Sequence, residues 1–331
     1  MKVSILGTGS FGSALANILA NNGHTVVLWG ILQEEIDEIN NYHTNSKYFE
    51  DVKIHESVKA STNLEIIKDS DMILFAIPSI AINEVSTKII PYLTKPFIAI
   101  NVAKGFHPVT HERLSIVIKN AINSDYLIDV VSLIGPSHAE EVVLGLLTTV
   151  NAVCENDEVA KKVQLAFSND FFRVYRNNDV IGAEIGVALK NIMAIASGIL
   201  VGVGQGDNAK AALMARGLNE MVAYGTYFNG LKETYLGLTG VGDLIVTCTS
   251  HHSRNFQAGL AIGKAGGAKE FLKDNKKTVE GIVCCKIVHE VAKENGISMP
   301  ITEQVYQVLF EDKNPIDSIN ELMNRDLKKE Y

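Results

Sequence analysis

Cysteine is scarce in this sequence, and its placement excludes the sites that cysteine usually builds. The 331 residues include only four cysteines, Cys154, Cys248, Cys284 and Cys285. They form no CxxC pair, show no metal-ligand spacing and are too few for a disulfide-rich secreted scaffold. We therefore expect reduced thiols in a cytoplasmic protein without a metal site.

Long uncharged apolar runs are also missing. The longest begins after Asn191 and ends at Gly204, which is shorter than the roughly 18 residues that a membrane-spanning helix requires. The N-terminus superficially resembles a signal peptide, but Gly7, Gly9 and Gly12 interrupt its apolar region. The sequence thus predicts no insertion into a membrane.

The chain has no excess of positive charge. Lys and Arg total 30 against 38 Asp and Glu, which gives a net charge of −8. This balance argues against nucleic acid or an anionic membrane as the main partner, although it permits a local basic pocket for a small anion. The hydrophobic share of 47% is typical of a soluble globular protein, and the length suggests about two domains.

The first half of the chain alternates between short apolar runs and helical patterns. The predicted strands are Val3–Leu6, Thr25–Trp29, Asp71–Ile77, Phe97–Asn101, Val131–Ile134 and Thr148–Val153. The predicted helices are Ser10–Asn21, Gln33–Asn40, one ending at about Ile90, one at about Thr110–Ile122 and Asp157–Ser168. This alternation implies parallel strands with helices on both faces of the sheet.

From about Val180 onward the pattern becomes helical. The predicted helices are Ile181–Val203, Ala209–Phe228, Arg254–Ala265, Val283–Asn295 and Ile301–Phe310. The charged segment Asn324–Tyr331 is interpreted as a solvated helix end. We therefore expect an α/β domain over residues 1–180 and an all-helical domain over residues 181–331.

A glycine-rich motif of the form G-x-G-x-x-G lies between the first predicted strand and the first predicted helix. Gly7 permits the tight turn, Gly9 lets the backbone approach a pyrophosphate, and Gly12 lets the helix pack on the sheet. The pyrophosphate would face free N–H groups at the positive end of the helix dipole. A plain strand-to-helix turn is the alternative, but this position favours a Rossmann-type dinucleotide site.

The end of the second predicted strand does not specify which dinucleotide binds. An acidic residue there would contact the ribose of NAD, and a basic residue would contact the extra phosphate of NADP. The sequence instead continues as Trp29-Gly30-Ile31-Leu32. The choice between NAD and NADP therefore stays open.

Two further turns follow predicted strands of the same sheet. Lys104 comes just after the strand that ends at Asn101, where a lysine can hold a phosphate or polarise a carbonyl, although a solvated surface charge is the better interpretation of a lone lysine. Ser137 opens another strand-to-helix turn and, with Glu140, has the spacing of a capping box. Considered alone, the capping box is the better interpretation of Ser137.

The helical half carries polar residues in unexpected places. Lys190 interrupts an apolar helix, so we expect it to be paired, to have a lowered pKa, or to extend to the surface. Asp243 lies in a glycine-rich turn. Ser253, Arg254 and Asn255 open a helix and combine a hydroxyl, a guanidinium and an amide with backbone N–H groups, which suits a small phosphate.

Taken together, these segments resemble the soluble, NAD(P)-dependent glycerol-3-phosphate dehydrogenases, in particular the bacterial form. The resemblance covers nearly the whole chain and rests on six motifs in the order of the family. They are GTGSFG, NVAKGF, IGPSHAEEV, ALKNIMAIASG, GLTGVGDLIVTCTSHHSRNF and TVEGI. The resemblance implies a dinucleotide-binding domain followed by a helical substrate-binding domain, and a cytoplasmic homodimer that supplies phospholipid synthesis.

The resemblance also implies roles for individual residues. Lys190 would be the catalytic proton donor and acceptor, assisted by Lys104 and Asp243. Substrate contacts would come from Lys104, Gly135, Ser137, Lys190, Asp243, Ser253, Arg254 and Asn255. NAD(P)H contacts would come from Gly7, Gly9, Ser10, Phe11, Gly12, Lys104, Ala139, Arg254, Thr278 and Glu280. Ile31 departs from the Arg or His of many bacterial members, so the contact at that position is not carried over.

The implied reaction is reversible hydride transfer between the nicotinamide and C2 of a three-carbon phosphate, dihydroxyacetone phosphate or glycerol 3-phosphate. Lys190 would donate the proton in reduction, with Lys104 and Arg254 as nearby cations and Asp243 orienting the ammonium. We expect this chemistry between the two domains. The alternatives are a β-hydroxyacid or ketopantoate-type reductase, which would not need the phosphate cluster at Ser253–Asn255, and a non-catalytic nucleotide sensor, which would tolerate loss of Lys190 or Asp243.

Overall fold

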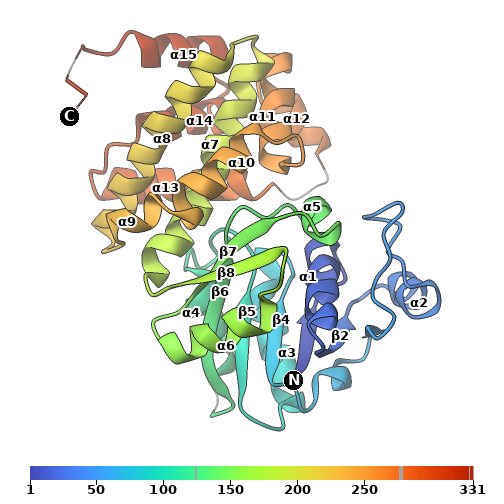
Figure 1. Cartoon of the computed structure of the whole chain (residues 1–331). Coiled ribbons are helices and arrows are strands. Elements are labelled where there is room, and N and C mark those ends of the chain that lie inside the picture. The colour runs from blue at the N-terminus through green and yellow to red at the C-terminus, as the bar shows by residue number, and fades with distance from the viewer. Residues whose placement is uncertain (124, 276–278, 328, 331) are drawn as a thin grey trace. The chain divides into compact units, whose positions relative to one another are not determined.

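The chain divides into two compact units in the computed structural model, which describes residues 1–123, 125–275, 279–327 and 329–330. Unit 1 comprises Met1–Glu184 and unit 2 comprises Ile185–Tyr331. Figure 1 shows unit 1 in blue to green and unit 2 in yellow-green to red. All described strands belong to unit 1, and the described elements of unit 2 are helices. The predicted fold class, an α/β domain followed by a helical domain, is confirmed.

Unit 1 is built on one eight-stranded sheet. Its strands are β1 (Lys2–Leu6), β2 (Thr25–Trp29), β3 (Lys59–Ser61), β4 (Met72–Phe75), β5 (Phe97–Asn101), β6 (Leu127–Ile134), β7 (Thr148–Val153) and β8 (Phe172–Asn177). They lie in the order β3-β2-β1-β4-β5-β6-β7-β8. The strands that follow β1 in the chain, β2 and β3, lie on one side of it, and the later strands from β4 onward lie on the other side. Open α/β sheets bind ligands at such a reversal of strand order, at the carboxyl ends of the strands.

One strand pair departs from the predicted parallel arrangement. β6 and β7 are antiparallel, whereas the other neighbouring pairs of the sheet are parallel. The connection between these two strands carries only the short helix α5 (Ala139–Val143). A helix of five residues rises about 7 Å, whereas a six-residue strand extends about 20 Å. The connection therefore does not return the chain to the start of a parallel strand.

The two edge strands of the sheet, β3 and β8, were not predicted from the sequence. β3 has only three residues, and β8 alternates buried and exposed positions, with Arg173 and Arg176 exposed. Neither strand has the continuous apolar run that identifies a strand buried on both faces.

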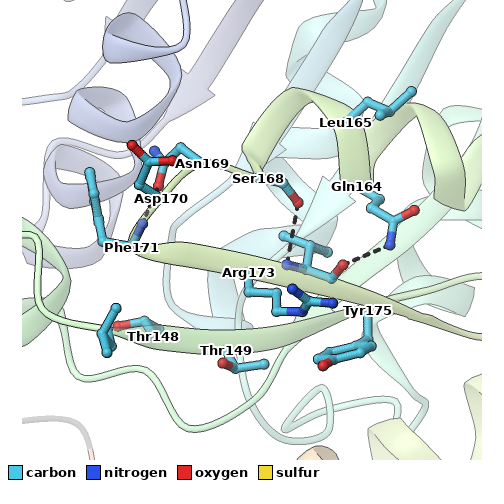
Figure 2. Close-up of a pocket in the computed structure, with 12 residues that line it drawn as sticks. Thr148, Thr149, Gln164, Leu165, Ser168, Asn169, Asp170, Phe171, Arg173 and Tyr175 are labelled. Carbon is cyan, nitrogen blue, oxygen red and sulfur yellow. Dashed lines mark hydrogen bonds between the residues drawn. The ribbon is translucent and has the colours of Figure 1, made fainter.

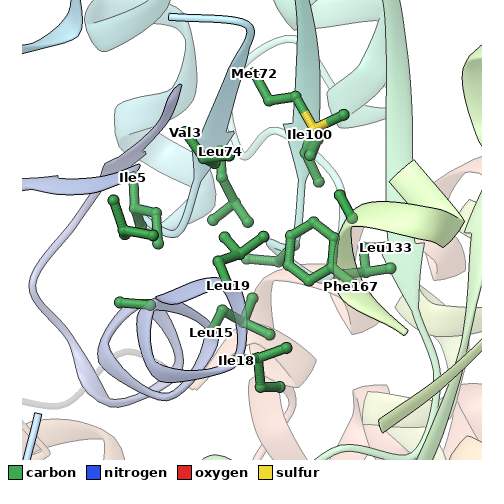
Figure 3. Close-up of a cluster of buried hydrophobic side chains, with 14 of the residues drawn as sticks. Val3, Ile5, Leu15, Ile18, Leu19, Met72, Leu74, Ile100, Leu133 and Phe167 are labelled. Carbon is green, nitrogen blue, oxygen red and sulfur yellow. The ribbon is translucent and has the colours of Figure 1, made fainter. Parts of the chain in front are cut away.

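Helices cover both faces of this sheet. They are α1 (Ser10–Asn21), α2 (Gln33–Tyr42), α3 (Ile82–Ile89), α4 (Leu114–Ile122), α5 and α6 (Asp157–Phe167). One buried cluster packs the sheet against α1 and α6 through Leu19 and Phe167, as Figure 3 shows. A second cluster packs it against α3 and α4. Leu74 belongs to the first cluster and Phe75 to the second, because successive side chains of a strand point to opposite faces.

Unit 2 consists of packed helices. They are α7 (Val180–Gly202, whose first residues belong to unit 1), α8 (Asp207–Tyr227), α9 (Lys232–Tyr235), α10 (Asp243–Thr249), α11 (Arg254–Ala265), α12 (Lys269–Asp274), α13 (Glu280–Glu294), α14 (Pro300–Phe310) and α15 (Pro315–Met323). A π-helical turn, Leu238–Gly242, precedes α10. The five predicted helices are present, and the four short ones were missed because a few turns give little periodicity.

Two details of unit 2 differ from the sequence-based expectations. The last helix ends at Met323, so the described residues of the predicted helix end at 324–331 are not helical, because this charged segment has no apolar stripe to bury. The helix α7 is also longer than the predicted apolar run. Its length and composition would suffice to cross a membrane, but 89% of its apolar window is buried, as in the core helix of a soluble protein.

Close packing of α7 on α11 organises unit 2. A Cβ atom at Gly259 of α11 would lie 2.0 Å from the carbonyl oxygen of Ile195, and one at Gly198 of α7 would lie 2.1 Å from that of Phe256. Distances this short leave room only for glycine. The two backbones therefore touch, and this contact aligns the polar segment of α7 with the start of α11.

The first residues of α7, which belong to unit 1, are anchored within that unit by Glu184, a residue that the sequence analysis did not single out. Its side chain is buried and accepts hydrogen bonds from Ser115 Oγ at 2.8 Å, Ser132 Oγ at 2.6 Å and Arg113 Nη1 at 3.2 Å. Two hydroxyl groups and a guanidinium compensate a carboxylate that would otherwise be costly to bury. Glu184 thus connects α7 to α4 and β6.

Candidate active site

The glycine-rich loop has the geometry of a pyrophosphate site. Gly7 has φ +120°, and a Cβ atom there would lie 2.3 Å from the carbonyl oxygen of Ala76. A Cβ atom at Gly12 would lie 2.3 Å from the carbonyl oxygen of Gly7, whereas one at Gly9 would meet no atom within 4 Å. The loop is therefore closed toward the sheet and open above Gly9.

The start of α1 offers this open side its backbone N–H groups. Gly9 is the N-cap, and no side chain in the described part of the chain caps the helix. Ser10 and Phe11, the first two helical residues, are half-buried. Uncapped N–H groups at the positive end of a helix suit a phosphate, so the residues of this loop fit the dinucleotide that the motif predicts.

The turn after β2 carries no charge, but the tertiary structure brings two charged residues to the loop. Ile31 is 78% exposed, as expected of a position without a structural partner. Glu35 of α2 lies behind the loop, where it accepts a hydrogen bond from Thr8 Oγ1 at 2.5 Å. It also forms an ion pair with Lys47 Nζ at 2.7 Å. The sequence analysis missed both residues, since neither adjoins the glycine motif along the chain.

Three predicted substrate residues of unit 1 converge on one carbonyl group. Lys104 Nζ donates to the carbonyl oxygen of Gly135 at 3.3 Å, and Ser137 Oγ donates to the same oxygen at 3.1 Å. These residues come from the carboxyl ends of β5 and β6, which are neighbours in the sheet. A cation and a hydroxyl therefore lie side by side at the ligand-binding edge of the sheet.

The capping-box interpretation of Ser137 is wrong. The N-cap of α5 is His138, and no side chain caps this helix among the described residues. Because the helix begins one residue later than expected, the Ser137 hydroxyl donates to the Gly135 carbonyl within the preceding turn instead. Ala139, predicted to contact the cofactor, is the first residue of α5 and is buried.

Lys190 lies at the centre of a buried polar cluster in unit 2. Its side chain is only 3% exposed, and its Nζ lies 2.5 Å from Asp243 Oδ1 and 2.8 Å from Thr247 Oγ1. The expectation of a paired lysine is confirmed, and the alternative of a lysine that extends to the surface is wrong, because α7 is buried all round at this position.

Asp243 is placed by its helix rather than by a loop. It is the first residue of α10, and Thr247 lies one turn later on the same face. Thr247 Oγ1 also donates to the backbone carbonyl of Asp243 at 2.5 Å. The sequence analysis did not single out Thr247, although the spacing of four residues within a helix would have pointed to it.

The predicted phosphate residues open α11. Ser253 is the buried N-cap and accepts a hydrogen bond from the backbone N–H of Phe256 at 3.2 Å, whereas Arg254 is exposed at the first helical position. The Asn255 side chain donates to Asn191 Oδ1 at 3.0 Å and accepts from the backbone N–H of Gly281 at 2.9 Å. Asn255 therefore also connects α7, α11 and α13.

The remaining predicted residues lie at the start of α13. Glu280 is its first residue and is half-buried, and Thr278 lies outside the described residues.

Cys248 of α10 follows Thr247, a member of the Lys190 cluster. Burial raises the pKa of the Cys248 thiol to about 12, so this cysteine stays protonated. Within the described residues, no group of three His, Cys, Asp or Glu side chains has the arrangement of a metal site.

A pocket of about 460 Å³ at the edge strand β8 contains none of the predicted site residues. Figure 2 shows that its polar side chains bond to the strand itself: Gln164 donates to the carbonyl of Val174 at 2.7 Å, and Ser168 accepts from its N–H at 3.3 Å. These groups are occupied in holding β8 to α6. This pocket therefore gives no evidence for the location of the chemistry.

Known proteins resemble this chain over its full length. The family model described as the N-terminus of NAD-dependent glycerol-3-phosphate dehydrogenase matches residues 2–160, and the C-terminal model matches residues 179–320. A glycerol-3-phosphate dehydrogenase [NAD(P)+] of Staphylococcus epidermidis is 49% identical over 330 residues, which are 99% of each chain.

Solved structures agree in fold. The glycerol-3-phosphate dehydrogenase of Coxiella burnetii has a TM-score of 0.90 and 36% identity, covering 98% of this chain and 99% of that one. A ketopantoate reductase of Ralstonia eutropha reaches a TM-score of 0.61 at 14% identity, over 96% of this chain and 100% of that one, and shares the fold alone. By its sequence, its fold and the residues gathered at both predicted sites, the chain belongs to the NAD-dependent glycerol-3-phosphate dehydrogenase family.

Proposed function

We propose that this protein reduces dihydroxyacetone phosphate to sn-glycerol 3-phosphate with NADH or NADPH and catalyses the reverse oxidation. The observation that carries the proposal is the buried cluster of Lys190, Asp243 and Thr247, because reduction of a ketone requires a proton donor where negative charge develops. When bound, the reduced nicotinamide supplies the hydride to C2 of the substrate. Membership of the family supports both the cofactor and the substrate.

Lys190 is the proposed proton donor. Asp243 Oδ1 and Thr247 Oγ1 accept from its ammonium and hold Nζ in place from one helix. An ammonium held at this position would donate its proton to the C2 oxygen of the ketone during reduction. In the oxidation, neutral Lys190 takes the proton from the C2 hydroxyl, and Asp243 stabilises the ammonium that forms.

Cationic and hydrogen-bonding groups complete the proposed substrate site. Lys104 and Ser137, which converge on the Gly135 carbonyl, would contact the substrate from unit 1. Arg254, Asn255 and the N–H groups at the start of α11 would bind the phosphate, since a guanidinium and a helix N-terminus both favour an anion. The exposed position of Arg254 supports this role, because its guanidinium is accessible to a ligand.

The proposed cofactor site uses the loop Gly7–Gly12 for the pyrophosphate, with Ser10, Phe11 and Ala139 as further contacts. Arg254 and Glu280 are proposed to contact the cofactor from unit 2. We also propose that the protein is a cytoplasmic homodimer whose product enters glycerophospholipid synthesis. Light scattering coupled to size-exclusion chromatography tests the dimer, since a monomer mass would contradict it.

A spectrophotometric assay at 340 nm tests the proposed reaction. The purified protein is given NADH or NADPH with dihydroxyacetone phosphate, unphosphorylated dihydroxyacetone or ketopantoate. We expect fast oxidation of the nicotinamide with the phosphorylated ketone and much slower oxidation with the other two. A preference for ketopantoate would favour the alternative reductase, and cofactor binding without turnover of any substrate would favour a nucleotide sensor.

A further inference from the structure

The glycine-rich loop is held from behind by side chains outside its motif. Thr8, between the first two glycines, is 5% exposed and bonded through both its hydroxyl and its carbonyl group. Its hydroxyl donates to Glu35 Oε2 at 2.5 Å. Its carbonyl accepts from Asn45 Nδ2 at 2.7 Å, and the same nitrogen lies 2.9 Å from Ser13 Oγ on the first turn of α1.

These contacts bridge the parts of the loop that face a dinucleotide. Asn45 is completely buried and links the loop to the start of α1, whose N–H groups point to the open side. A Cβ atom at Gly30, at the end of β2, would lie 2.6 Å from the Thr8 side chain. The end of β2, the loop and the start of α1 are therefore fixed against one another around Thr8.

The charge of Glu35 is balanced within the same network. Its side chain is 8% exposed, and the ion pair with Lys47 Nζ at 2.7 Å uses the oxygen that Thr8 does not. Lys47 itself is 54% exposed, so it compensates the carboxylate from the solvent side. Without it, a buried negative charge would lie directly behind a loop built to bind an anion.

We propose that Glu35, Asn45 and Lys47 are positioning residues of the dinucleotide site: Glu35 and Asn45 fix Thr8 so that the loop is preorganised, and Lys47 neutralises Glu35. This inference rests on the proposed function only in taking a dinucleotide as the ligand. A loop that is already ordered loses less conformational freedom on binding, so the network raises cofactor affinity. It touches neither Lys190 nor the reacting atoms, so the rate at saturating cofactor stays the same.

The pair Asn45→Ala and Asn40→Ala separates positioning from general stability. Asn40 is a matched control because it also makes two hydrogen bonds, to the N–H and carbonyl of Ala60, but does not touch the loop. We expect Asn45→Ala to raise the Kd of NADH, measured by fluorescence titration, about tenfold, with kcat at saturating cofactor within about twofold of wild type. Asn40→Ala leaves the Kd unchanged.

Hydrogen exchange in the cofactor-free protein gives a readout that does not depend on activity. The amides of Gly7, which donates to the Trp29 carbonyl at 2.7 Å, and Ser13, which donates to the Gly9 carbonyl at 3.0 Å, should exchange faster in Asn45→Ala than in wild type or in Asn40→Ala, because the loop loses its link to α1. Equal Kd and exchange changes in the two variants would overturn the positioning role of Asn45.

The charge balance is tested by Lys47→Met, alone and with Glu35→Gln. The single variant leaves the charge of Glu35 uncompensated and should raise the Kd of NADPH about tenfold. The Kd of NADH should rise less, because NADH lacks the negative charge of the extra phosphate. The double variant should regain most of this loss, since Gln still accepts from Thr8. The control is Lys88→Met, which removes a similarly exposed lysine from its ion pair with Glu84 and should leave the Kd of both dinucleotides unchanged.

Failure of this inference is distinguishable from failure of the proposed function. If the double variant binds NADPH as weakly as Lys47→Met does, Lys47 contacts the ligand directly and the neutralising role is wrong. If wild type binds both dinucleotides but does not reduce dihydroxyacetone phosphate, the proposed function fails while the binding measurements above still decide the inference.

Discussion

At the scale of single residues, the buried charge of Lys190 is the feature that a purely structural account explains least well. A helix packed on all sides would be more stable with an apolar residue at this position, because desolvating an ammonium costs more than its ion pair with Asp243 returns in many proteins. Three of its neighbours along α7, Leu189, Ile192 and Met193, are fully buried apolar residues. The buried charge therefore supports the proposed role of Lys190 as the proton donor.

Lys190→Ala is expected to lower kcat by about 10²–10⁴-fold, the usual effect of losing a general acid. Binding of the dinucleotide is expected to persist, because the glycine-rich loop belongs to unit 1. Steady-state kinetics and a fluorescence titration measure the two effects. A variant with nearly normal kcat would contradict the assignment.

A fold control accompanies this measurement, because Lys190→Ala leaves Asp243 buried without its cation. Lys190→Met combined with Asp243→Asn removes both charges together and should unfold close to wild type while remaining inactive. Thermal melts of both variants then separate lost chemistry from lost structure.

Arg254→Ala is expected to remove a charge-assisted contact worth about 1.5–3 kcal/mol. The variant should therefore lose more affinity for dihydroxyacetone phosphate than for unphosphorylated dihydroxyacetone. The KM of both ketones and the Kd of NADH measure this difference. Equal losses for both ketones would show that Arg254 does not bind the phosphate.

Ile31 bears on the choice of cofactor. Its exposed, uncharged side chain neither attracts nor repels the phosphate of NADP, so wild type should use NADH and NADPH with kcat/KM values within about 30-fold. Ile31→Arg should shift the preference toward NADPH without changing kcat for NADH. A strong preference of wild type for NADPH would mean that a basic group elsewhere in the chain binds the phosphate.

At the scale of helices, the contact between α7 and α11 controls how the residues of unit 2 meet. Gly259→Ala would place a Cβ atom 2.0 Å from the Ile195 carbonyl oxygen, a backbone atom of another helix. We expect unfolding free energy to fall by at least about 2 kcal/mol, because the helices must separate. Urea denaturation measures it, with Gly267→Ala, whose Cβ would meet no atom within 4 Å, as the matched control. Equal midpoints for the two variants would refute the tight contact.

At the scale of the whole molecule, stability should depend on pH through Glu220 of α8. This buried carboxyl group accepts hydrogen bonds from the N–H groups of Ile301 at 2.5 Å and Thr302 at 3.1 Å, and so caps α14. Burial raises its pKa from 4.5 to about 7, and the hydrogen bonds oppose this shift only partly.

The direction of the effect follows from proton binding. Between pH 4.5 and pH 7 the folded protein holds a proton on Glu220 that the unfolded chain has released. The stabilisation is thus complete below pH 4.5 and is lost as pH rises through 7, by a total of about 3 kcal/mol. Urea unfolding of wild type and Glu220→Gln at several pH values measures it. Parallel pH profiles for the two proteins would contradict the prediction.

Elements with a continuous apolar run or several helical turns were predictable from the sequence, and elements without such a pattern were not. Strands such as Thr25–Trp29 and Phe97–Asn101 agree with the predicted bounds because their apolar runs are buried on both faces. The strand β7 was predicted with its correct bounds, but its antiparallel direction was not, because direction depends on the connection and on distant neighbours. The edge strand β8 and the short helix α10 left no such signal.

The local sequence determined the components of this protein. The glycine spacing at 7, 9 and 12 specifies a loop that only a strand-to-helix turn accommodates, and the motifs around Lys104, Lys190 and Arg254 contain the residues proposed for the chemistry. These signals are local, because backbone conformation and helix periodicity depend on neighbours in the chain.

Only the tertiary structure decided which components meet. Asp243 lies 53 residues from Lys190 in the chain and 2.5 Å from it in space, and Glu35 reaches Thr8 across 27 residues. A buried charge needs a partner, but many side chains along the chain could supply it. Helix packing and sheet order select one of them, and these depend on contacts between segments that the linear sequence does not rank.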